Sequence, residues 1–442
     1  MTDTLTLAHL SDTHLGYEAY SVLSTAGNNL RGEDIVRAFG RNVAEIVAAD
    51  PPLVLLSGDV GDRPNLPIRY LLFIRARLAE LAGRRADGTR RQVVVISGNH
   101  DQPRSRLDAC FLELFSGIPG VHVVTTHYDV LELGRIEDSP GELADVVVHS
   151  LPHDQLKEVD FDVIRPKPGA INILMAHGVA GGSELYLRSI GREYAIPVDV
   201  LTRGWDYVAL GHYHKQGPVA VGGHSVHTTP IWYAGSTENM GFRDLVHGGG
   251  MGRGHLLVDV HAGDVPVVRP INLPIRSMLR LPVIDASGLS PSQITSALVD
   301  AVQAAPIAGA VVSQIVTGVP RDIWSLVDRG PALRAAAGAM HYEVSPRHQS
   351  DDEARSAVTR ERGSLGNLAR DLDAIIAERG VGADLIDEVR QLAASLLGSA
   401  LNQTTHEIAE TSAEGTPIEG TASDESPDSG GASAEGGVEV LA

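Results

Sequence analysis

The chain has 442 residues, 43% of them apolar, and a formal net charge of −20 at pH 7. This length and apolar content allow a large buried core divided among two or three domains, which excludes a disordered or fibrous chain. The acidic balance excludes a protein that simply coats nucleic acid, because such proteins are usually basic.

The first 115 residues alternate strand-like and helix-like segments. Short apolar runs rich in Val, Leu and Ile predict buried strands, whereas apolar residues spaced three and four apart predict amphipathic helices. We expect strands at 5–10, 53–57 and 93–97, and helices near 33–49, 67–81 and 104–115. This alternation predicts right-handed crossovers and a largely parallel sheet covered by helices.

Further strand-like runs predict a second sheet that packs against the first one. They lie at 146–149, 171–176, 206–210 and 227–234. The expected fold class is therefore α/β, with two packed β-sheets flanked by helices.

A separate α+β unit is expected from residue 273 onward. A strand-like run at 278–284 precedes a helix at 294–302, and Ser290 and Gln293 have the spacing of a capping box with proline at the first helical position. A second strand is expected at 311–317. Two amphipathic helices follow at 365–375 and 385–396, and the tail from residue 403 has nine acidic residues with no Lys or Arg, which predicts disorder.

Five short motifs place polar residues in a fixed order along the first half of the chain. They are Asp12-Thr-His14, Gly58-Asp59, Gly98-Asn99-His100-Asp101, His177-Gly178 and Gly211-His212-Tyr-His214. Each motif is weak alone in a chain with 18 histidines, but four of the five directly follow a strand-like run. Open α/β sheets bind ligands at these strand ends, so the motifs are expected to converge.

The residue types of the motifs suit a centre with two metal ions. Two divalent cations about 3.5–4 Å apart can clamp the attacking and leaving oxygens of a phosphoryl group and make a water acidic enough to attack. A carboxylate must bridge the ions, and Asp59 is the candidate. Imidazole and oxygen ligands without cysteine suit manganese, iron or zinc better than calcium or magnesium.

The pattern resembles the calcineurin-like metallophosphoesterase superfamily. Within it, the chain is most similar to the DNA double-strand-break repair nucleases, whose bacterial form is the nuclease subunit of the SbcCD exonuclease. This likeness rests on the segments 9–16, 57–59 and 98–101 and on Leu210-Gly211-His212-Tyr-His214-Lys215, and its narrowest marker is the segment Tyr233-Ala-Gly-Ser-Thr-Glu238. The chain departs from the family pattern at Val60-Gly61, which replaces larger apolar residues, and in a basic insertion at 84–91, which would bind DNA or form a solvated surface.

The resemblance implies a role for each motif residue. One metal would be held by Asp12, His14, Asp59 and His214, and the other by Asp59, Asn99, His177 and His212. His100 would face the phosphate as an acid or transition-state stabiliser. Arg104 and Arg106 would contact phosphate, with solvated arginines at a helix start as the alternative.

Other residues receive plainer interpretations. His9 lies within the first predicted strand and is expected to be a core or supporting histidine. His149 and His153 are expected at a turn or on the surface. The dense apolar run from Tyr70 to Ile74 indicates either the helix pair through which family members form homodimers or deep packing against the sheet.

The resemblance also implies a domain order: a nuclease domain at 1–272, a capping domain at 273–350, a helical partner-binding segment at 351–402 and a disordered tail at 403–442. The helical segment would bind an SbcC-like coiled-coil ATPase, although it could also pack on the body. The expected function is a manganese-dependent DNA exonuclease or endonuclease of DNA repair and recombination. The alternatives are a small-molecule phosphodiesterase or phosphatase and a metal-stabilised scaffold. The chain shows neither an apolar run of roughly 18 residues nor a leader-like start, so a cytoplasmic location without membrane attachment is expected.

Overall fold

The computed structural model describes residues 4–103, 105, 108–139, 142–183, 194–221, 225–248 and 252–348. Residues 1–351 form one compact unit and residues 352–442 a second one. The predicted helices at 365–396 and the acidic tail therefore lie outside the described residues. Within the described ranges, no helix is long and apolar enough to cross a membrane.

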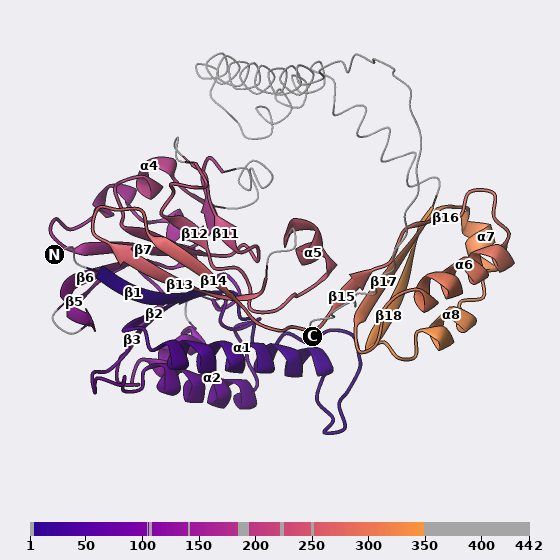
Figure 1. Cartoon of the computed structure of the whole chain (residues 1–442), viewed down its shortest axis with the longest axis horizontal. Coiled ribbons are helices and arrows are strands. Elements are labelled where there is room, and N and C mark those ends of the chain that lie inside the picture. Colours follow the sequence, from indigo (N-terminus) through magenta and orange to yellow (C-terminus); the bar gives the residue numbers. More distant parts are fainter. Residues whose placement is uncertain are drawn as a thin grey trace, which may run out of the picture. The chain divides into compact units, whose positions relative to one another are not determined.

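The first sheet has six strands in the order β14-β13-β1-β2-β3-β4 (Figure 1). Their bounds are β1 Thr4–Leu10, β2 Leu53–Ser57, β3 Gln92–Ile96, β4 Val121–Val124, β13 Gly254–His261 and β14 Val267–Asn272. Strands β1, β2, β3 and β4 run parallel to one another, whereas β13 pairs antiparallel with β1 and β14 pairs antiparallel with β13 at the edge. The predicted parallel sheet is confirmed, whereas the antiparallel edge was not predicted.

Helices α1 (Leu30–Ala49) and α2 (Ile68–Leu81) connect the parallel strands and lie together below the first sheet in Figure 1. The side chain of Asn29 caps α1 by accepting from the amide of Gly32, and Asp50 ends the helix in the left-handed conformation. The apolar stripes of both helices pack on β1, β2 and β3 around Phe39, which is fully buried.

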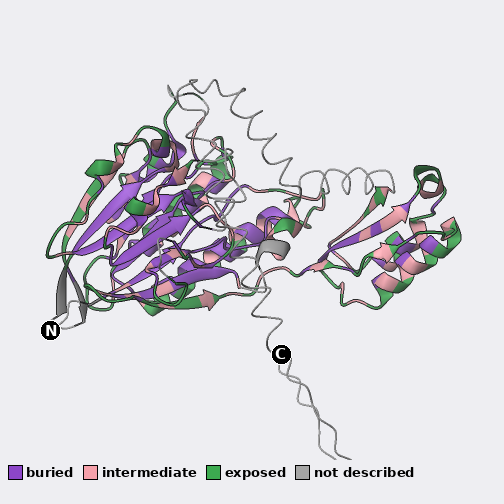
Figure 2. Ribbon diagram, turned by 90° about the horizontal axis from the view of Figure 1, so that it is seen from above, coloured by how far each residue is buried: buried purple, intermediate pink, exposed green. Residues whose placement is uncertain are grey.

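The second sheet also has six strands, in the order β11-β12-β10-β7-β6-β5. Their bounds are β5 Asp129–Ser139, β6 Glu142–Leu151, β7 Ile171–His177, β10 Tyr207–Gly211, β11 Gly217–Pro218 and β12 Ile231–Tyr233. The inner faces of the two sheets share one apolar core, and both sheets are mostly buried in Figure 2. The predicted α/β fold with two packed sheets is therefore confirmed.

Short elements complete this part of the chain. They are the 3-10 helices η1 (Phe111–Phe115), η2 (His153–Lys157) and η3 (Phe161–Val163), the strand pair β8 (Val179–Ala180) and β9 (Ala195–Ile196), and the helices α4 (Val198–Leu201) and α5 (Phe242–Gly248). The helix expected near 104–115 is wrong for residues 108–110, which are not helical. Cys110 has an extended backbone with ψ of 135°, so only one tight turn follows it.

A four-stranded parallel sheet follows, with β15 (Met278–Arg280), β16 (Ile284–Asp285), β17 (Val311–Val319) and β18 (His341–His348). Helices α6 (Pro291–Gln303), α7 (Arg321–Ser325) and α8 (Gly330–Ala335) cover one face of it (Figure 1). The predicted capping box is confirmed, because Ser290 and Gln293 each bond the other's backbone amide. The single strand expected at 278–284 is divided into β15 and β16.

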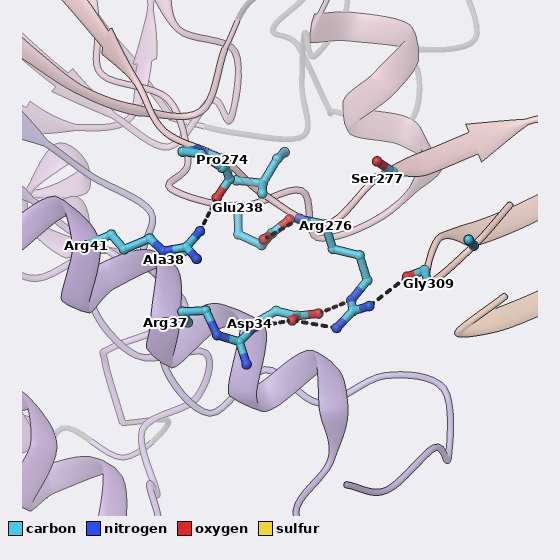
Figure 3. A pocket seen from close by; sticks show the side chains of 11 residues that line it. Asp34, Arg37, Ala38, Arg41, Glu238, Pro274, Arg276, Ser277 and Gly309 are labelled. Atoms are coloured by element: carbon cyan, nitrogen blue, oxygen red, sulfur yellow. Dashed lines mark hydrogen bonds and ion pairs between the residues drawn. The ribbon is translucent and has the colours of Figure 1, made fainter. Parts of the chain in front are cut away.

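One buried ion pair links this unit to α1. The guanidinium of Arg276 binds the carboxylate of Asp34 through two nitrogens and donates to the carbonyl of Gly309 at 2.6 Å (Figure 3). These residues and Arg41, which donates to the Pro274 carbonyl, line a cavity of about 330 Å³. Because Asp34 also pairs with Arg31 and Arg37, the charges in this cavity are largely paired with one another.

The basic insertion forms a hairpin whose arginines are largely bound to the protein itself. Arg91 is 1% exposed and donates to the carbonyls of Pro51 and Leu81. Arg85 pairs with Asp87 at 2.7 Å. These contacts favour a structural role for the insertion.

Candidate metal centre

The loops after β1 and β2 are joined by backbone hydrogen bonds that continue beyond the strands. The amides of Asp12 and His14 donate to the carbonyls of Gly58 and Asp59, at 3.1 and 3.0 Å. The parallel register of the sheet thus extends into the first two motifs. These loops meet the ends of β7 and β10, which bring the fourth and fifth motifs from the second sheet.

Four of the predicted ligands have positive φ, which is uncommon for residues with a side chain. The φ values are 51° at Asp12, 45° at His14, 50° at Asp59 and 103° at His212. Such conformations persist only where the surrounding structure enforces them, and they concentrate at functional sites. Here the four residues lie in the loops that follow β1, β2 and β10.

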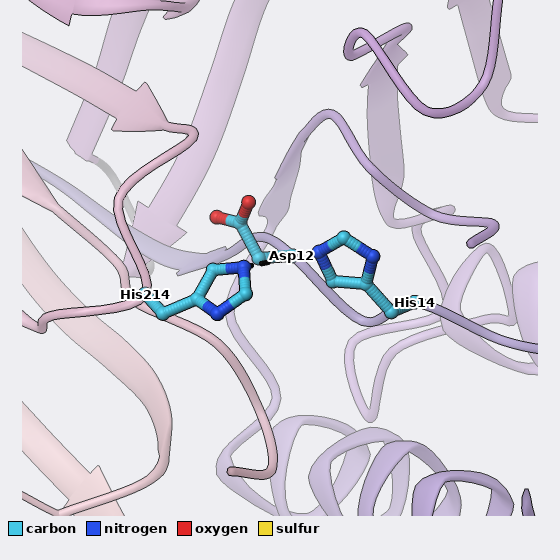
Figure 4. A group of neighbouring side chains, drawn as sticks. All are labelled: Asp12, His14 and His214. Carbon is cyan, nitrogen blue, oxygen red and sulfur yellow. Dashed lines mark hydrogen bonds between the residues drawn. The ribbon is translucent and has the colours of Figure 1, made fainter. Parts of the chain in front are cut away.

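The first group of side chains consists of Asp12, His14 and His214, whose potential ligand atoms all lie within 4.8 Å of one another (Figure 4). The Nε2 atoms of the two histidines are 3.1 Å apart. The outer nitrogen of His214, Nδ1, lies 3.3 Å from both carboxylate oxygens of Asp244 on α5. Asp244 thus fixes the orientation of this ring, and its role was not predicted from the sequence.

The second group consists of Asn99, His177 and His212. The side-chain oxygen of Asn99 lies 3.2 Å from His177 Nε2 and 3.1 Å from His212 Nδ1. The opposite nitrogen of His177, Nδ1, donates to the carbonyl of Ser57 at 2.7 Å. A carbonyl can only accept, so Nδ1 carries a proton, and Nε2 faces the centre, where it presents a lone pair whenever the ring is neutral.

The carboxylate of Asp59 lies between the two groups. Its Oδ2 is 3.7 Å from His14 Nε2 and 3.4 Å from His177 Nε2. Burial acts to raise the pKa of Asp59, but the nearby histidines, His177 first, outweigh burial and hold this pKa well below its usual value. Burial acts to lower the pKa of His177, but Asp59 outweighs it and raises this pKa to about 9.

These contacts fit a divalent cation in each group. His177 Nε2 faces the oxygens of Asn99 and Asp59, so positive charge is favoured among these atoms: either a proton on Nε2, in keeping with the raised pKa of His177, or a cation in its place. Two ligands about 2.1 Å from one cation and at right angles to each other are about 3 Å apart, which matches the 3.1 Å between His14 and His214. The donors are nitrogen and oxygen atoms, which suit first-row metals.

His100 lies beside the first group without joining it. Its amide donates to Asp59 Oδ1 at 2.9 Å, and its ring meets the ring of His14 edge to face, with centroids 4.8 Å apart. Its Nδ1 lies 2.9 Å from the carbonyl of Asp62, so Nε2 remains to meet a ligand. The residue is exposed, as the predicted contact with a phosphate requires.

Asp101 supports the loop that carries Asn99 and His100. Its buried carboxylate accepts from the amides of Val60, Gly61 and Gly98 at 3.2, 2.8 and 2.9 Å. Burial and the neighbouring charge of Asp59 raise the pKa of Asp101 to about 7. The carboxylate therefore ties the second and third motifs together through backbone amides.

The segment from Tyr233 to Glu238 makes hydrogen bonds that hold loops near the centre in place. The hydroxyl of Tyr233 donates to the Gly178 carbonyl at 2.9 Å and accepts from the Ala180 amide at 2.9 Å, which fixes the loop after His177. Glu238 is 1% exposed and pairs with Arg31 at 3.4 Å. Within the described residues, this marker segment therefore positions loops of the centre.

The structure shows where His149 and His153 lie, and neither is simply a surface residue. His149 is 3% exposed, so the expected turn or surface position is wrong; it lies within β6 and bonds the hydroxyl of Tyr128 at 2.6 Å. His153 begins η2 and its ring stacks on His212, with centroids 5.9 Å apart and an interplanar angle of 27°. Its Nδ1 is 3.2 Å from the His177 carbonyl, and burial lowers its pKa to about 4.

The other predicted site residues have clear outcomes. His9 is buried as expected and bonds Tyr207 and Ser57 at 2.9 and 2.8 Å. Arg104 and Arg106 lie outside the described residues, so their phosphate contacts remain predictions. The ligand roles of the motif residues also remain predictions, although the structure brings all of their side chains together.

Two packed sheets with this Asp, Asn and His cluster at their strand ends define a metallophosphoesterase fold. Residues 5–216 match the calcineurin-like phosphoesterase family, and this part of the chain is a calcineurin-like phosphoesterase domain. Enzymes of this class use divalent metals, which agrees with the grouped side chains.

The chain is similar to two curated proteins and to one solved structure, as follows. The DNA double-strand break repair protein Mre11 of Sulfurisphaera tokodaii is 24% identical over 277 residues, which are 61% of this chain and 63% of that protein. The SbcD component of the nuclease SbcCD of Rhodobacter capsulatus is 29% identical over 328 residues, covering 64% of this chain and 73% of that protein. The crystal structure of the calcineurin-like phosphoesterase YfkN from Bacillus subtilis covers 61% of this chain and 91% of its own, with 14% identity and a TM-score of 0.36.

Proposed function

We propose that the chain is a manganese-dependent DNA nuclease that hydrolyses phosphodiester bonds during DNA end processing, double-strand-break repair and recombination. The observation that carries the proposal is the position of Asp59, whose Oδ2 lies 3.7 Å from His14 and 3.4 Å from His177. One carboxylate oxygen within reach of both groups is what a bridged pair of cations needs. The relatives support the substrate, because one is named as a DNA break repair protein and the other as a nuclease.

In this proposal each motif residue would either bind a cation or act on the substrate. Asp12, His14 and His214 hold one cation, Asn99, His177 and His212 hold the other, and Asp59 is shared. When bound, the two cations supply the Lewis acidity that activates water and offsets the charge developing on the phosphate. The Asp62 carbonyl accepts from His100 Nδ1, so Nε2 is the atom that would meet the leaving oxygen; the imidazolium form of His100 would donate its Nε2 proton to that oxygen and become the neutral ring with its proton on Nδ1.

Replacement of Asp59 tests the two-metal proposal. Asp59→Asn keeps the shape of the side chain but removes the charge that both cations would share, so we expect elemental analysis to show loss of bound manganese together with loss of hydrolysis. Asp264→Asn is the matched control, because Asp264 is an exposed carboxylate in a surface turn. An Asp59→Asn protein that retains two metals and normal hydrolysis would contradict the assignment.

The choice of substrate needs a separate assay. End-labelled linear and hairpin DNA, incubated with manganese or magnesium, should be cut by the wild-type protein. Turnover of bis(p-nitrophenyl) phosphate without any cutting of DNA would instead support a small-molecule phosphodiesterase or phosphatase. Metal binding without turnover of either substrate would support a metal-stabilised scaffold.

We further propose two protein partners and a cytoplasmic site of action. An SbcC-like coiled-coil ATPase would bind the segment 351–402, which lies outside the described residues. A second copy of the chain would pack against α2, where Ile68 is 73% and Leu72 is 63% exposed. Tyr70 and Ile74 of the same helix are buried. One side of its apolar run therefore packs in the core, and the other side is exposed.

A further inference from the structure

His153 contacts the three segments that carry the proposed ligands of the second group. Its amide donates to the carbonyl of Ser97 at 3.2 Å, directly after β3 and two residues before Asn99. Its ring nitrogen Nδ1 lies 3.2 Å from the carbonyl of His177, and its ring stacks on the ring of His212 with an interplanar angle of 27°. Asn99, His177 and His212 belong to three different motifs, so one residue joins segments that are far apart in the sequence.

The turn that carries His153 is itself held in place. The residue begins η2, two residues after the end of β6 in the second sheet. Leu156 of η2 packs so closely on the backbone at Gly178 that a Cβ atom there would clash with the Leu156 Cδ1 atom. The side chain of Gln155 donates to the Thr126 carbonyl at 2.6 Å. These contacts fix η2, and η2 in turn fixes the position of the His153 ring.

The ring of His153 adjoins the ligands without being a ligand itself. The His177 carbonyl can only accept, so Nδ1 of His153 carries a proton and cannot bind a cation. Among the described residues, the groups whose potential ligand atoms lie within 4.8 Å of one another do not include His153. The imidazole therefore acts on the second group through the orientation of its neighbours.

His212 is the neighbour that depends most on such support. Its φ of 103° is rarely adopted by residues with a Cβ atom and persists only where the surrounding structure enforces it. The ring of His153 stacks on its ring, and the ring of His177 meets it edge to face with centroids 5.3 Å apart. Partners that orient metal ligands in this way typically contribute about 10- to 100-fold to metal affinity.

We propose that His153 is a positioning residue that holds His177 and His212 in the orientation that binds the second cation. The inference deepens the proposed function and rests on it, because it assumes that these two histidines bind a metal. The first group is held differently, since Asp244 on α5 faces His214. Removal of the His153 side chain should therefore weaken only one of the two ions.

Manganese titration of the full chain by calorimetry and electron paramagnetic resonance tests this role. In His153→Ala we expect one manganese to bind about 10- to 100-fold more weakly and the other to bind as in the wild type, so that at limiting manganese the spectrum of a coupled pair gives way to that of a single ion. His153→Asn keeps an N–H donor in the place of Nδ1, and His153→Phe keeps a ring that can stack on His212, so each should recover part of the lost affinity. His127→Ala, at an exposed histidine, should bind manganese as the wild type does.

Two further backgrounds assign the weakened ion to one group. His214→Ala removes a proposed ligand of the first group, and His177→Ala removes one of the second group. Adding His153→Ala should weaken the remaining ion in the His214→Ala protein and leave it unchanged in the His177→Ala protein. A general structural defect would instead weaken the remaining ion in both.

Turnover of bis(p-nitrophenyl) phosphate completes the test. At saturating manganese, His153→Ala should regain kcat within about twofold of the wild type, because all of the ligands and His100 are still present. If the wild type binds two manganese ions and His153→Ala binds both equally well, or if His153→Ala weakens the remaining ion in both backgrounds, the positioning role is wrong while the nuclease proposal stands. If neither His153→Asn nor His153→Phe binds manganese better than His153→Ala, the two side-chain contacts do not carry the effect and the role is also wrong. If the wild type binds no manganese, the proposed function fails and this inference fails with it.

Discussion

The backbone amide of His212 donates to both carboxylate oxygens of Asp12, at 3.2 and 3.1 Å, across 200 residues of sequence. Asp12 follows β1 of the first sheet and His212 follows β10 of the second one. The contact thus joins the strand ends of both sheets within the centre itself. Both residues have positive φ, so the packing of the two sheets must hold them in place.

The closeness of the sheets at this point predicts that Gly211 cannot carry a side chain. A Cβ atom there would lie 2.0 Å from the Ser57 carbonyl oxygen and 2.1 Å from Ser11 Oγ. Backbone must move to accommodate it, and such overpacking typically costs about 1–3 kcal/mol. We expect Gly211→Ala to lower the free energy of unfolding by at least that amount and to weaken manganese binding.

Chemical denaturation of Gly211→Ala and of Gly117→Ala would check this prediction. A Cβ at Gly117 meets no atom within 4 Å, so the second variant should unfold like the wild type. Equal stability of the wild type and Gly211→Ala would show that the two sheets are packed less closely than described.

Substitutions of His100 and His177 should distinguish the chemical step from metal binding. Successive side chains in an extended segment point in different directions, so His100 can face the phosphate while Asn99 faces the cation. We expect His100→Ala to keep both metals and its affinity for DNA but to lose roughly 10²–10⁴ in turnover. His177→Ala should lose metal as well as turnover.

Elemental analysis, a DNA-binding titration and single-turnover cleavage, made on both variants, distinguish these outcomes. Equal loss of metal in the two proteins would mean that His100 is a ligand or a structural support. Its assignment as an acid would then have to be withdrawn.

The sequence predicted the main sheets and the members of the centre because both leave local signals. Val- and Leu-rich runs mark the buried parallel strands, and each motif sits directly at a strand end. The antiparallel edge strand β14 was not predicted, because its residues alternate between intermediate and exposed positions without a continuous apolar run. Partners such as Asp244 and Asp62 depend on contacts between loops, which no spacing in the sequence reveals.

The C-terminal segment carries the predicted association with an ATPase. The helices expected at 365–396 have apolar stripes that a disordered extension would not need. Deletion of residues 360–442 should leave manganese-dependent hydrolysis of a small diester within about twofold of the full chain while removing co-purification with the ATPase. A second truncation, of residues 403–442 alone, removes only the acidic tail and should preserve the association. Survival of co-purification after the longer deletion would place the binding surface elsewhere.

His255 predicts a pH dependence of stability at a position away from the motifs. Its ring is fully buried in β13, and Nδ1 lies 2.8 Å from the side-chain oxygen of Asn42. Nε2 has no hydrogen-bond partner among the described residues. Burial lowers the pKa of His255 from 6.5 to about 4 in the folded protein, because protonation would place a charge at this unpartnered nitrogen.

The lowered pKa of His255 determines whether the stability of the folded protein rises or falls with pH. Below pH 6.5 the unfolded chain binds a proton at His255 that the folded chain does not bind until the pH approaches 4. The stability that this residue contributes is fully present above pH 6.5 and falls as the pH drops, by at most about 1.4 kcal/mol per pH unit. Between pH 7 and pH 5, the wild type should lose about 2 kcal/mol more than His255→Gln, which has no titrating ring.

Urea unfolding at both pH values, in the presence of a chelator so that the metal centre contributes equally to each protein, measures this difference. His255→Gln should be less stable than the wild type at pH 7, because the buried ring is lost, but its stability should change less with pH. His227→Gln, at an exposed histidine, should follow the wild type. Parallel losses in the wild type and His255→Gln would mean that the folded protein protonates His255 as readily as the unfolded chain, and that burial at β13 is not what controls its charge.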